Sequence, residues 1–414
     1  MTERKRIAIW TLYDFANTSF AIIVVTFLYA VYFRKVVAGD ESVGDLYWSI
    51  ATSASMAVTG LIAPILGAIA DHSAGKKRFL LFFTLICIIA TGLLYFVGPG
   101  DIVLGILLLI IANIGFEAGL IFYDAFLPEI TSPKNYGRVS GYGFAAGYLG
   151  SLTSLAIVFP FIQQDLIRES FPVAAAFFLI FSLPLFIFLK DTRKEVTRTE
   201  SYIKIGFNRV RHTLKHLKYR KNLAWFLLSY FVYIEGVNTV IYFAGIYAST
   251  TLGFTQIELI MFFITVQSTA IVGSILLGVM SDKIGQKRTI VISLVIWIVT
   301  VILAFFITGK QEFYLVGLLA GAAMGSSQST SRSLMSKLTP SDHKTEFFGF
   351  YSFFGKSSAV IGPLVFGVIS YLTGSQRYAI LSLLVFFVVG IILLQKVEDN
   401  NPENETGPDK TEPV

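Results

Sequence analysis

The stretch GAIADHSAGKKR, from Gly67 to Arg78, has a second copy in GVMSDKIGQKR, from Gly278 to Arg288. In each copy a glycine is followed four residues later by an acid, Asp71 or Asp282, and then by another glycine and a basic cluster. The glycine and the acid both repeat at an offset of 211 residues (278 minus 67 and 282 minus 71). Such a repeat predicts that the chain consists of two related halves.

The composition places these halves in a membrane. Hydrophobic residues make up 54% of the 414 residues and charged residues only 14%, whereas soluble domains are about 45–50% apolar and about 25% charged. Apolar stretches of about 20 residues, enough to cross about 30 Å of hydrocarbon as helices, recur from end to end. A β-barrel would instead show short segments of alternating polarity. The chain is therefore predicted to be an all-α membrane protein.

Twelve spans are predicted, and a long connection divides them into two groups of six. They lie at about 7–34, 46–70, 79–98, 102–127, 138–162, 172–189, 223–248, 256–280, 289–308, 312–336, 345–372 and 377–395. The predicted domains are an N-terminal six-helix bundle (1–189), a cytoplasmic linker (190–222), a C-terminal six-helix bundle (223–395) and a disordered cytoplasmic tail (396–414).

The basic residues predict the orientation. With the N-terminus in the cytoplasm, only five of the 33 Lys and Arg residues lie in external segments, and two more, Arg332 and Lys356, lie within spans. All the others fall in cytoplasmic segments, in agreement with the positive-inside rule. We therefore expect a multi-pass protein of a bacterial cell membrane with both termini in the cytoplasm. Because these loops account for the net charge of +6, that charge does not indicate a nucleic-acid partner.

The linker contains a basic amphipathic segment. Its apolar residues recur at steps of four, three, four and three, which places them on one helical face, and basic residues occupy much of the rest. We expect a helix that lies on the cytoplasmic leaflet and binds anionic lipids. A helix that binds a protein partner is the alternative. The apolar positions are Ile203, Phe207, Val210, Leu214 and Leu217.

A second pair of corresponding stretches lies in the first and seventh spans. An acid, an Asn and a Thr coincide at an offset of 221 residues (235 minus 14): Asp14, Asn17 and Thr18 match Glu235, Asn238 and Thr239. An Asp at the centre of a membrane helix costs about 2.5–3.5 kcal/mol on insertion scales, so the pattern needs a reason. One interpretation is a duplicated packing feature in which Asn and Thr bond across helices. The other is that both acids face a polar cavity between the halves.

The loop repeat resembles the loop motif of the major facilitator superfamily, and this resemblance implies a fold of two six-helix bundles. It also implies that the loop helps latch the halves together in one of two conformations. The glycine permits close helix approach, and the acid can pair with cations and helix ends. In the first copy His72 stands where a basic residue is common, so that latch is expected to be the weaker. The implied latch residues are Gly67, Asp71, Gly278, Asp282 and Arg288.

Longer stretches resemble one branch of that superfamily, the fungal vacuolar amino-acid effluxers linked to autophagy and their bacterial relatives. They are WTLYDFANTSFA (Trp10–Ala21), FYDAFLPEI (Phe122–Ile130), RVSGYGFAAGYLG (Arg138–Gly150), FFGFYSFFGKSSAVIGP (Phe347–Pro363) and a polar run with Gln328 and Arg332. Asp124 departs from the pattern, because many relatives have Asn there. The resemblance implies alternating access and transport of a small solute, with amino acids as one class.

In the facilitator architecture the first helix of each three-helix unit lines a central cavity, here spans one, four, seven and ten. Those spans carry all the predicted site residues except Lys356, which lies in span eleven. The predicted substrate and coupling residues are Asp14, Asn17, Glu117, Asp124, Glu235, Asn238, Gln328, Arg332 and Lys356.

Two roles are expected for these residues. Glu117 lies roughly 22 Å into its span, near mid-membrane, and is the first choice for a group that loads and releases a proton. Asp124 is either a second proton station or a permanent partner of Arg332. For a zwitterionic solute, Glu235 is expected to bind the ammonium and Arg332 the carboxylate, with the two asparagines completing the hydrogen bonds. The competing interpretation is that the charges only pair with one another and an uncharged solute binds elsewhere.

The leading hypothesis is a secondary transporter driven by an ion or solute gradient, and two other function classes are the alternatives. A membrane-embedded enzyme would show a clustered catalytic set and no two-fold repeat, so the repeat counts against an enzyme. A receptor or scaffold on a transporter fold stays open. No cofactor is expected, and no metal site, because His212 and His216 are four residues apart but lack an evident third ligand.

Overall fold

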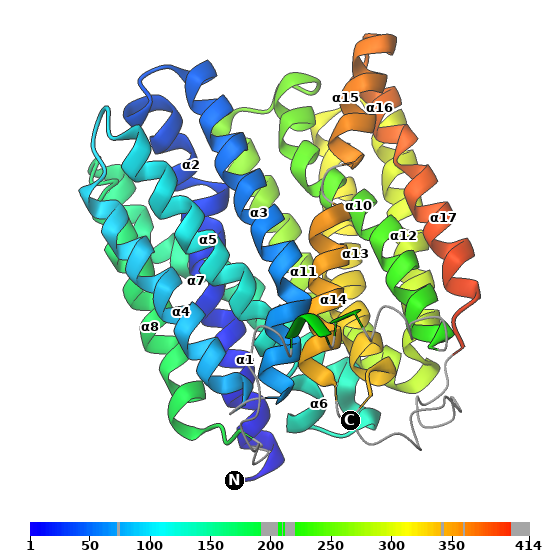
Figure 1. The fold of residues 1–414 in the computed structure, drawn as a ribbon. Coiled ribbons are helices and arrows are strands. Elements are labelled where there is room, and N and C mark those ends of the chain that lie inside the picture. Colours follow the sequence, from blue (N-terminus) through cyan, green and yellow to red (C-terminus); the bar gives the residue numbers. More distant parts are fainter. Residues whose placement is uncertain are drawn as a thin grey trace, which may run out of the picture.

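The structure, a computed structural model, describes residues 1–72, 75–191, 206–208, 210–211, 220–340, 343–358 and 361–398. In these ranges the regular structure is helical throughout, as predicted. Figure 1 shows long helices that run side by side between two ends. We call the end at which α1 (Glu3–Phe20) begins and α17 (Leu384–Gln395) ends the base, and the opposite end the top (Figure 1).

The first half begins with α1, which continues towards the top through η1 (Ala21–Thr26), α2 (Leu28–Tyr32) and η2 (Phe33–Val37), where η1 and η2 are π-helical turns. The other elements of this half are α3 (Glu41–His72), α4 (Lys76–Leu93), η3 (Leu94–Phe96), α5 (Ile102–Asp124), α6 (Leu127–Ile130), η4 (Pro133–Asn135), α7 (Tyr136–Gln163) and α8 (Ser170–Phe188).

The second half begins at the base with α10 (Lys221–Thr250). It continues with α11 (Gln256–Ile284), α12 (Gln286–Phe306), α13 (Lys310–Leu338), α14 (Lys344–Ser357), α15 (Ile361–Thr373), α16 (Gln376–Ser382) and α17. Most of the predicted linker helix, both linker histidines and the tail from residue 399 on lie outside the described residues.

Eleven helical stretches in the described residues are long and apolar enough to cross a membrane, against twelve predicted spans. The helix that fails the test is α13, which is 29 residues long and packs against α11 and α12. Its second part carries the polar run from Gly325 to Ser336, which is buried except for the partly exposed Gln328. Because this run faces protein rather than lipid, hydropathy alone does not detect the span.

The eleventh predicted span is described as α14 up to Ser357 and as α15 from Ile361, and residues 359 and 360 lie outside the described residues. Together these helices form one of the eleven membrane-length stretches, Lys344–Thr373. The twelfth span is divided between α16 and α17 at Leu383.

Each half has its own apolar core, and the halves pack along two helix pairs. One core runs from Trp10 to Leu189, and the other draws mainly on residues from Leu223 to Val397. Across the halves α3 lies beside α14, as Figure 1 shows, and α7 packs on α11. A Cβ at Gly67 would collide with the carbonyl of Thr345, so a small residue is required at the α3–α14 crossing.

Candidate functional site

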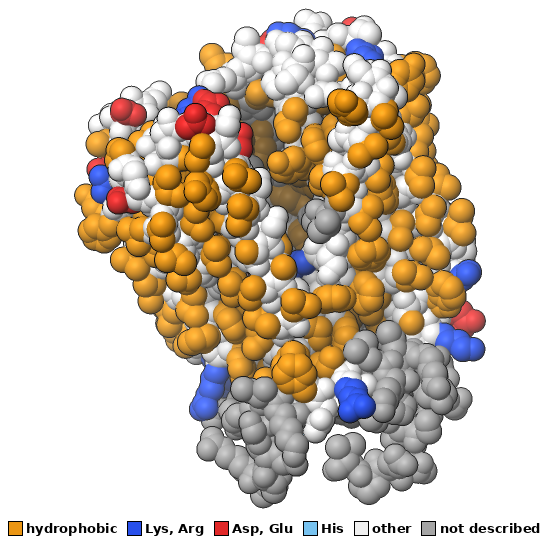
Figure 2. Space-filling model, turned by 45° about the horizontal axis from the view of Figure 1, so that its top comes forward, with side chains coloured by type: hydrophobic (Ala, Val, Ile, Leu, Met, Phe, Trp, Pro, Cys, Tyr) orange, Lys and Arg blue, Asp and Glu red, His pale blue; other side chains and the backbone are white. Residues whose placement is uncertain are grey.

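A cavity of about 550 Å³ lies between the two halves, in their upper part. Figure 2, in which the top is tilted forward, shows a hollow between the halves with hydrophobic side chains on its walls. Among the described residues that line the cavity none is charged. Its aromatic lining residues are Phe27, Tyr148, Tyr242, Phe243, Phe262, Phe263, Trp297 and Phe313.

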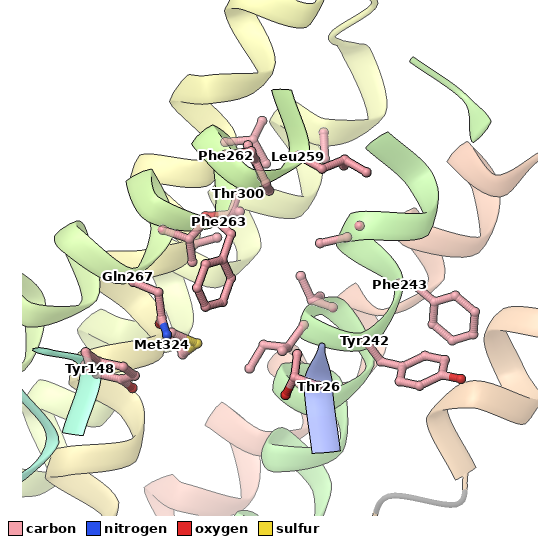
Figure 3. Close-up of a pocket in the computed structure, with 18 of the residues that line it drawn as sticks. Thr26, Tyr148, Tyr242, Phe243, Leu259, Phe262, Phe263, Gln267, Thr300 and Met324 are labelled. Carbon is pink, nitrogen blue, oxygen red and sulfur yellow. The ribbon is translucent and has the colours of Figure 1, made fainter. Parts of the chain in front are cut away.

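A small set of polar groups interrupts this apolar lining. The hydroxyl of Tyr148 on α7 donates to Oε1 of Gln328 on α13 at 2.7 Å, which joins the two halves. Figure 3 shows Gln267 and Met324 beside each other, with Tyr148 below them. Of the predicted site residues, Gln328 is the only one that lines this cavity.

Arg332 lies on α13 with a side chain only 2% exposed, and it reaches into the first half. Its Nε donates to Oγ of Ser140 at 2.9 Å, and its Nη2 donates to the carbonyl of Ser140 at 2.9 Å. Nη1 donates to Oδ1 of Asp124 at 3.0 Å, and both Nη atoms donate to Oδ2 of Asp14 at 3.2 Å. These contacts use the five N–H groups of a guanidinium, so Arg332 has no donor left for a solute in this conformation.

Aromatic rings enclose the same guanidinium. Its centre lies 4.2 Å from the ring centroid of Phe144 and 4.7 Å from that of Trp10, within the range of cation–π attraction. Trp10 stacks on Tyr123 at 4.7 Å, and each ring donates a hydrogen bond to the other residue's carbonyl at 3.1 Å. We call Arg332 with Asp14, Asp124 and Ser140 the charged floor.

The charged floor lies one helical turn below the cavity. Arg332 follows Gln328 by four residues on a helix that descends to the base, and Asp14 precedes Thr18 by four on a helix that rises from it. Gln328 and Thr18 line the cavity. Four residues correspond to about 6 Å of helix, so the charges close the cavity on the base side. The structure thus contains the Asp124–Arg332 pairing that sequence analysis left as an alternative.

A second ion pair joins the halves between α5 and α14. Lys356 Nζ lies 2.5 Å from Oε2 of Glu117, and the two side chains are only 14% and 11% exposed. Asn17 and Asn238, which are expected to complete the hydrogen bonds of a solute, are not among the described residues that line the cavity. Asn17 is 2% exposed and its Nδ2 has no hydrogen-bond partner, while Asn238 is partly exposed.

Glu235, the residue expected to bind the ammonium group of a solute, is not among the described residues that line the cavity. Its Oε1 accepts a hydrogen bond from the backbone N–H of Gly362 at the start of α15, and Oε2 is buried without a partner. Thr239, one turn on, donates its hydroxyl to the backbone carbonyl of Glu235 at 2.7 Å.

The two copies of the loop motif make corresponding contacts at the base. Asp71, at the end of α3, accepts backbone N–H bonds from Thr345 at 3.1 Å and Glu346 at 2.8 Å, at the start of α14. Asp71 thus binds the N-terminus of a helix of the opposite half, where the helix dipole favours a negative charge.

In the second copy Asp282, at the end of α11, accepts backbone N–H bonds from Gly137 at 2.7 Å and Arg138 at 3.1 Å, at the start of α7. It also forms an ion pair with Nε of Arg138 at 2.7 Å. The two hydrogen bonds from α14 to Asp71 in the first copy are backbone contacts and include no such ion pair. Arg288 is exposed to solvent.

Sequence reasoning did not assign roles to Trp10, Tyr123, Ser140 and Phe144, although all four lie in or beside the stretches quoted for their resemblance. The available signal was the position of Ser140 and Phe144 on one face of a helix rich in small residues, four residues apart. That signal places the two residues together but does not identify Arg332 as their partner.

Comparisons with known proteins agree with this architecture. The model of the family described as vacuole effluxer Atg22 like matches residues 31–407. An uncharacterized MFS-type transporter, YxiO of Bacillus subtilis, is 32% identical over 408 residues, with 94% of each chain covered. Autophagy-related protein 22 of Kluyveromyces lactis is 26% identical over 361 residues, covering 77% of this chain and 72% of that protein.

Among solved structures, the human organic anion transporter MFSD10 superimposes with a TM-score of 0.78 at 16% identity, covering 95% of this chain and 100% of that one. This likeness shows the fold, a multi-pass membrane architecture of the major facilitator superfamily, and the matched proteins are transporters rather than enzymes. With a family model that covers most of its length and a full-length relative at 32% identity, the chain belongs to the Atg22-like family of the major facilitator superfamily.

Proposed function

We propose that the protein is a secondary active transporter that moves a small solute across a membrane by alternating access, and that the structure is its top-open state. The observation that carries this proposal is the position of the cavity. It lies between the halves above the charged floor, while both motif acids hold the halves together at the base. A solute that enters from the top therefore meets a closed base.

Several interactions below the cavity cross from one half to the other. They are the charged floor, the Glu117–Lys356 pair and the two motif acids on helix N-termini. Opening the base has to break them, and water can then replace the lost hydrogen bonds, so the net cost of each is modest. A solute shifts such an equilibrium only by its differential affinity for the two states.

Amino acids are the solute class implied by the resemblance to the fungal effluxers, and the cavity is compatible with those that carry a large apolar side chain. The side chain would pack among the aromatic rings, and the polar end would lie towards Tyr148, Gln328 and the charged floor. The carboxylate can reach Arg332 only by replacing one of its present acceptors, Asp14, Asp124 or Ser140, because all donors of Arg332 are occupied. Solute binding would then loosen the charged floor and so promote opening of the base.

Binding and transport assays test this proposal. Thermal-shift measurements on purified protein with amino acids, peptides, sugars and nucleosides are expected to select a zwitterionic amino acid, and the methyl ester of that amino acid is expected to bind poorly. Uptake into liposomes then measures transport of the selected solute. Strong binding of a neutral sugar, unchanged by substitutions at Glu235 and Arg332, would contradict the amino-acid assignment.

Proton coupling through Glu117 is the second part of the proposal. Opening the base would separate Glu117 from Lys356, and a buried carboxyl without its cation takes up a proton more readily than a paired one. Glu117→Gln is therefore expected to abolish solute accumulation driven by a pH gradient. Accumulation equal to that of the wild type would exclude this role for Glu117.

The proposed orientation has the base in the cytoplasm of a bacterial cell. In a variant without the single cysteine Cys87, we compare a cysteine at Lys134, exposed at the base, with one at Gln164, exposed at the top. An impermeant thiol reagent added to intact cells is expected to label position 164 and to spare position 134. The reverse pattern would invert the orientation.

A further inference from the structure

The carboxyl group of Glu235 lies beside the described start of α15. Glu235 is 1% exposed, and its Oε1 accepts the backbone N–H of Gly362 in the first turn of α15. A Cβ at Gly362 would collide with Oε1 of Glu235 and with Oγ1 of Thr239, so this close approach requires glycine. The other carboxyl oxygen, Oε2, is buried and has no hydrogen-bond partner.

No cation faces this carboxyl from the described parts of the helices that pack on α10. Arg332 on α13 is bound to Asp14 and Asp124, and Lys356 on α14 is bound to Glu117. The helix α17 has no ionisable side chain. The other ionisable groups of the neighbouring helices and of α10 near this level are Tyr230, Tyr233, Tyr351 and Tyr371, and α11 carries its own only near its ends, at Glu258, Asp282 and Lys283.

A carboxylate buried in a membrane needs compensation that this place does not offer. A single backbone N–H stabilises a negative charge by much less than its burial without a counter-charge costs. A bound proton removes the charge and with it most of that cost. A metal cation takes several oxygen ligands at once, whereas a proton needs only the single unpartnered oxygen found here.

We infer that Glu235 is a proton-binding site, which carries a proton on Oε2 in the top-open state and releases it to water when α10 and α15 move apart. Its role in coupling rests on the proposed transport function, but the presence of the proton does not. Glu117, the group that the sequence favoured for this role, instead lies 2.5 Å from the cation Lys356 in the same state. The two acids therefore carry protons in different conformations.

Infrared spectroscopy of the purified protein tests the inference directly, because only a protonated carboxyl shows the corresponding C=O stretch. At pH 7 the wild type is expected to show this band and Glu235→Gln to lose it. Glu117→Gln, the matched substitution of another intramembrane acid, is expected to keep it. Gln retains the shape of the side chain and the oxygen that accepts from Gly362, so the variant is expected to fold. A band that survives in Glu235→Gln, or a wild type without the band, overturns the inference.

Two further measurements distinguish a proton from a metal cation at Glu235 and test the role of Glu235 in coupling. The first compares the unfolding temperature in sodium chloride with that in choline chloride. If sodium chloride raises it more in the wild type, and Glu235→Gln abolishes this difference, the site binds a metal cation and the proton assignment is overturned. In liposomes Glu235→Gln is expected to lose accumulation driven by a pH gradient, and retained accumulation excludes the coupling role. If the wild type moves no solute of any class, the transport proposal fails, while the infrared band still decides whether Glu235 holds a proton.

Discussion

Asp14 and Glu235 occupy corresponding positions in the two halves, yet their surroundings are opposite. Asp14 is bound by both Nη atoms of Arg332 in the charged floor. Glu235 has no cation in the described residues around it, and its Oε1 accepts a backbone N–H from α15. The duplication therefore repeats the place of the acid on its helix, but the partner of that acid is set separately in each half.

The difference follows from how charges are divided between the halves. The first half supplies the acids Asp14, Glu117 and Asp124, and the second half supplies the cations Arg332 and Lys356. The pairs Asp14–Arg332, Asp124–Arg332 and Glu117–Lys356 each join an acid of the first half to a cation of the second, whereas Asp282–Arg138 at the base has the opposite polarity. Glu235 is an acid of the second half and takes part in none of these pairs.

Among the substitutions that test this comparison, removal of Arg332 is expected to have the largest effect on stability. Arg332→Gln leaves Asp14 and Asp124 buried without their cation, which costs about 3–5 kcal/mol of stability. Thermal unfolding of the purified protein measures the loss. Arg332→Lys is expected to recover little, because one ammonium cannot replace a planar fork that donates five hydrogen bonds.

A matched arginine controls for loss of charge and packing alone. Arg377 lies in the same half and donates one hydrogen bond to the carbonyl of Phe305 at 2.9 Å. Arg377→Gln is expected to lower the unfolding temperature far less than Arg332→Gln does. Equal losses in the two variants would show that the charged floor contributes no special stability.

Neutralising the two corresponding acids compares them directly. Asp14→Asn removes a charge-assisted partner of Arg332 and is expected to cost about 1.5–3 kcal/mol at neutral pH. Glu235→Gln is expected to cost about 1 kcal/mol or less, because it replaces a group that is already neutral in our interpretation. Thermal unfolding of both variants at one pH gives the comparison, and a larger loss in Glu235→Gln would reverse it.

The two motif acids are expected to differ by a smaller amount. Asp282→Asn and Asp71→Asn each replace an anion at a helix N-terminus by a neutral amide, which costs about 0.3–2 kcal/mol. Asp282→Asn also removes the ion pair with Arg138, so it is expected to shift the population further towards the base-open state. Spin labels at Arg78 and Lys283, on opposite halves at the base, would report this as a longer distance. A greater shift in Asp71→Asn would contradict the order predicted from these contacts.

The fold could be predicted from the sequence because its signals are local. Apolar stretches of membrane length and the repeated Gly-xxx-Asp loops suffice for twelve spans in two halves. The tenth predicted span, α13, fails the hydropathy criterion because of its buried polar run. The division of the twelfth span at Leu383 was not predicted.

For the charged floor, the sequence identified the charges but only part of their contacts. Arg332 and Asp124 were recognised as intramembrane charges, which are costly unless they are paired, and their pairing was one of two alternatives. The other contacts of Arg332 depend on the rotation of each helix about its axis and on the conformation of the whole transporter, and neither is encoded in residue spacing. For this reason Ser140, Trp10 and Phe144 around Arg332 received no role. That the predicted residues bind a solute stays a prediction.

The smallest expected effect concerns the hydrogen bond above the charged floor. Tyr148→Phe removes the donor to Gln328, a neutral bond that is worth about 0.5–1.5 kcal/mol. If the polar end of the solute occupies this place, its affinity falls by about 2- to 13-fold, since 1.4 kcal/mol corresponds to a factor of ten. Tyr142→Phe is the matched control, because Tyr142 lies on the same helix with 39% of its surface exposed and does not line the cavity. A binding isotherm for each variant measures the change. Equal affinities for the wild type and Tyr148→Phe, or the same loss in both variants, would remove this contact from the solute site and leave it a link between the halves.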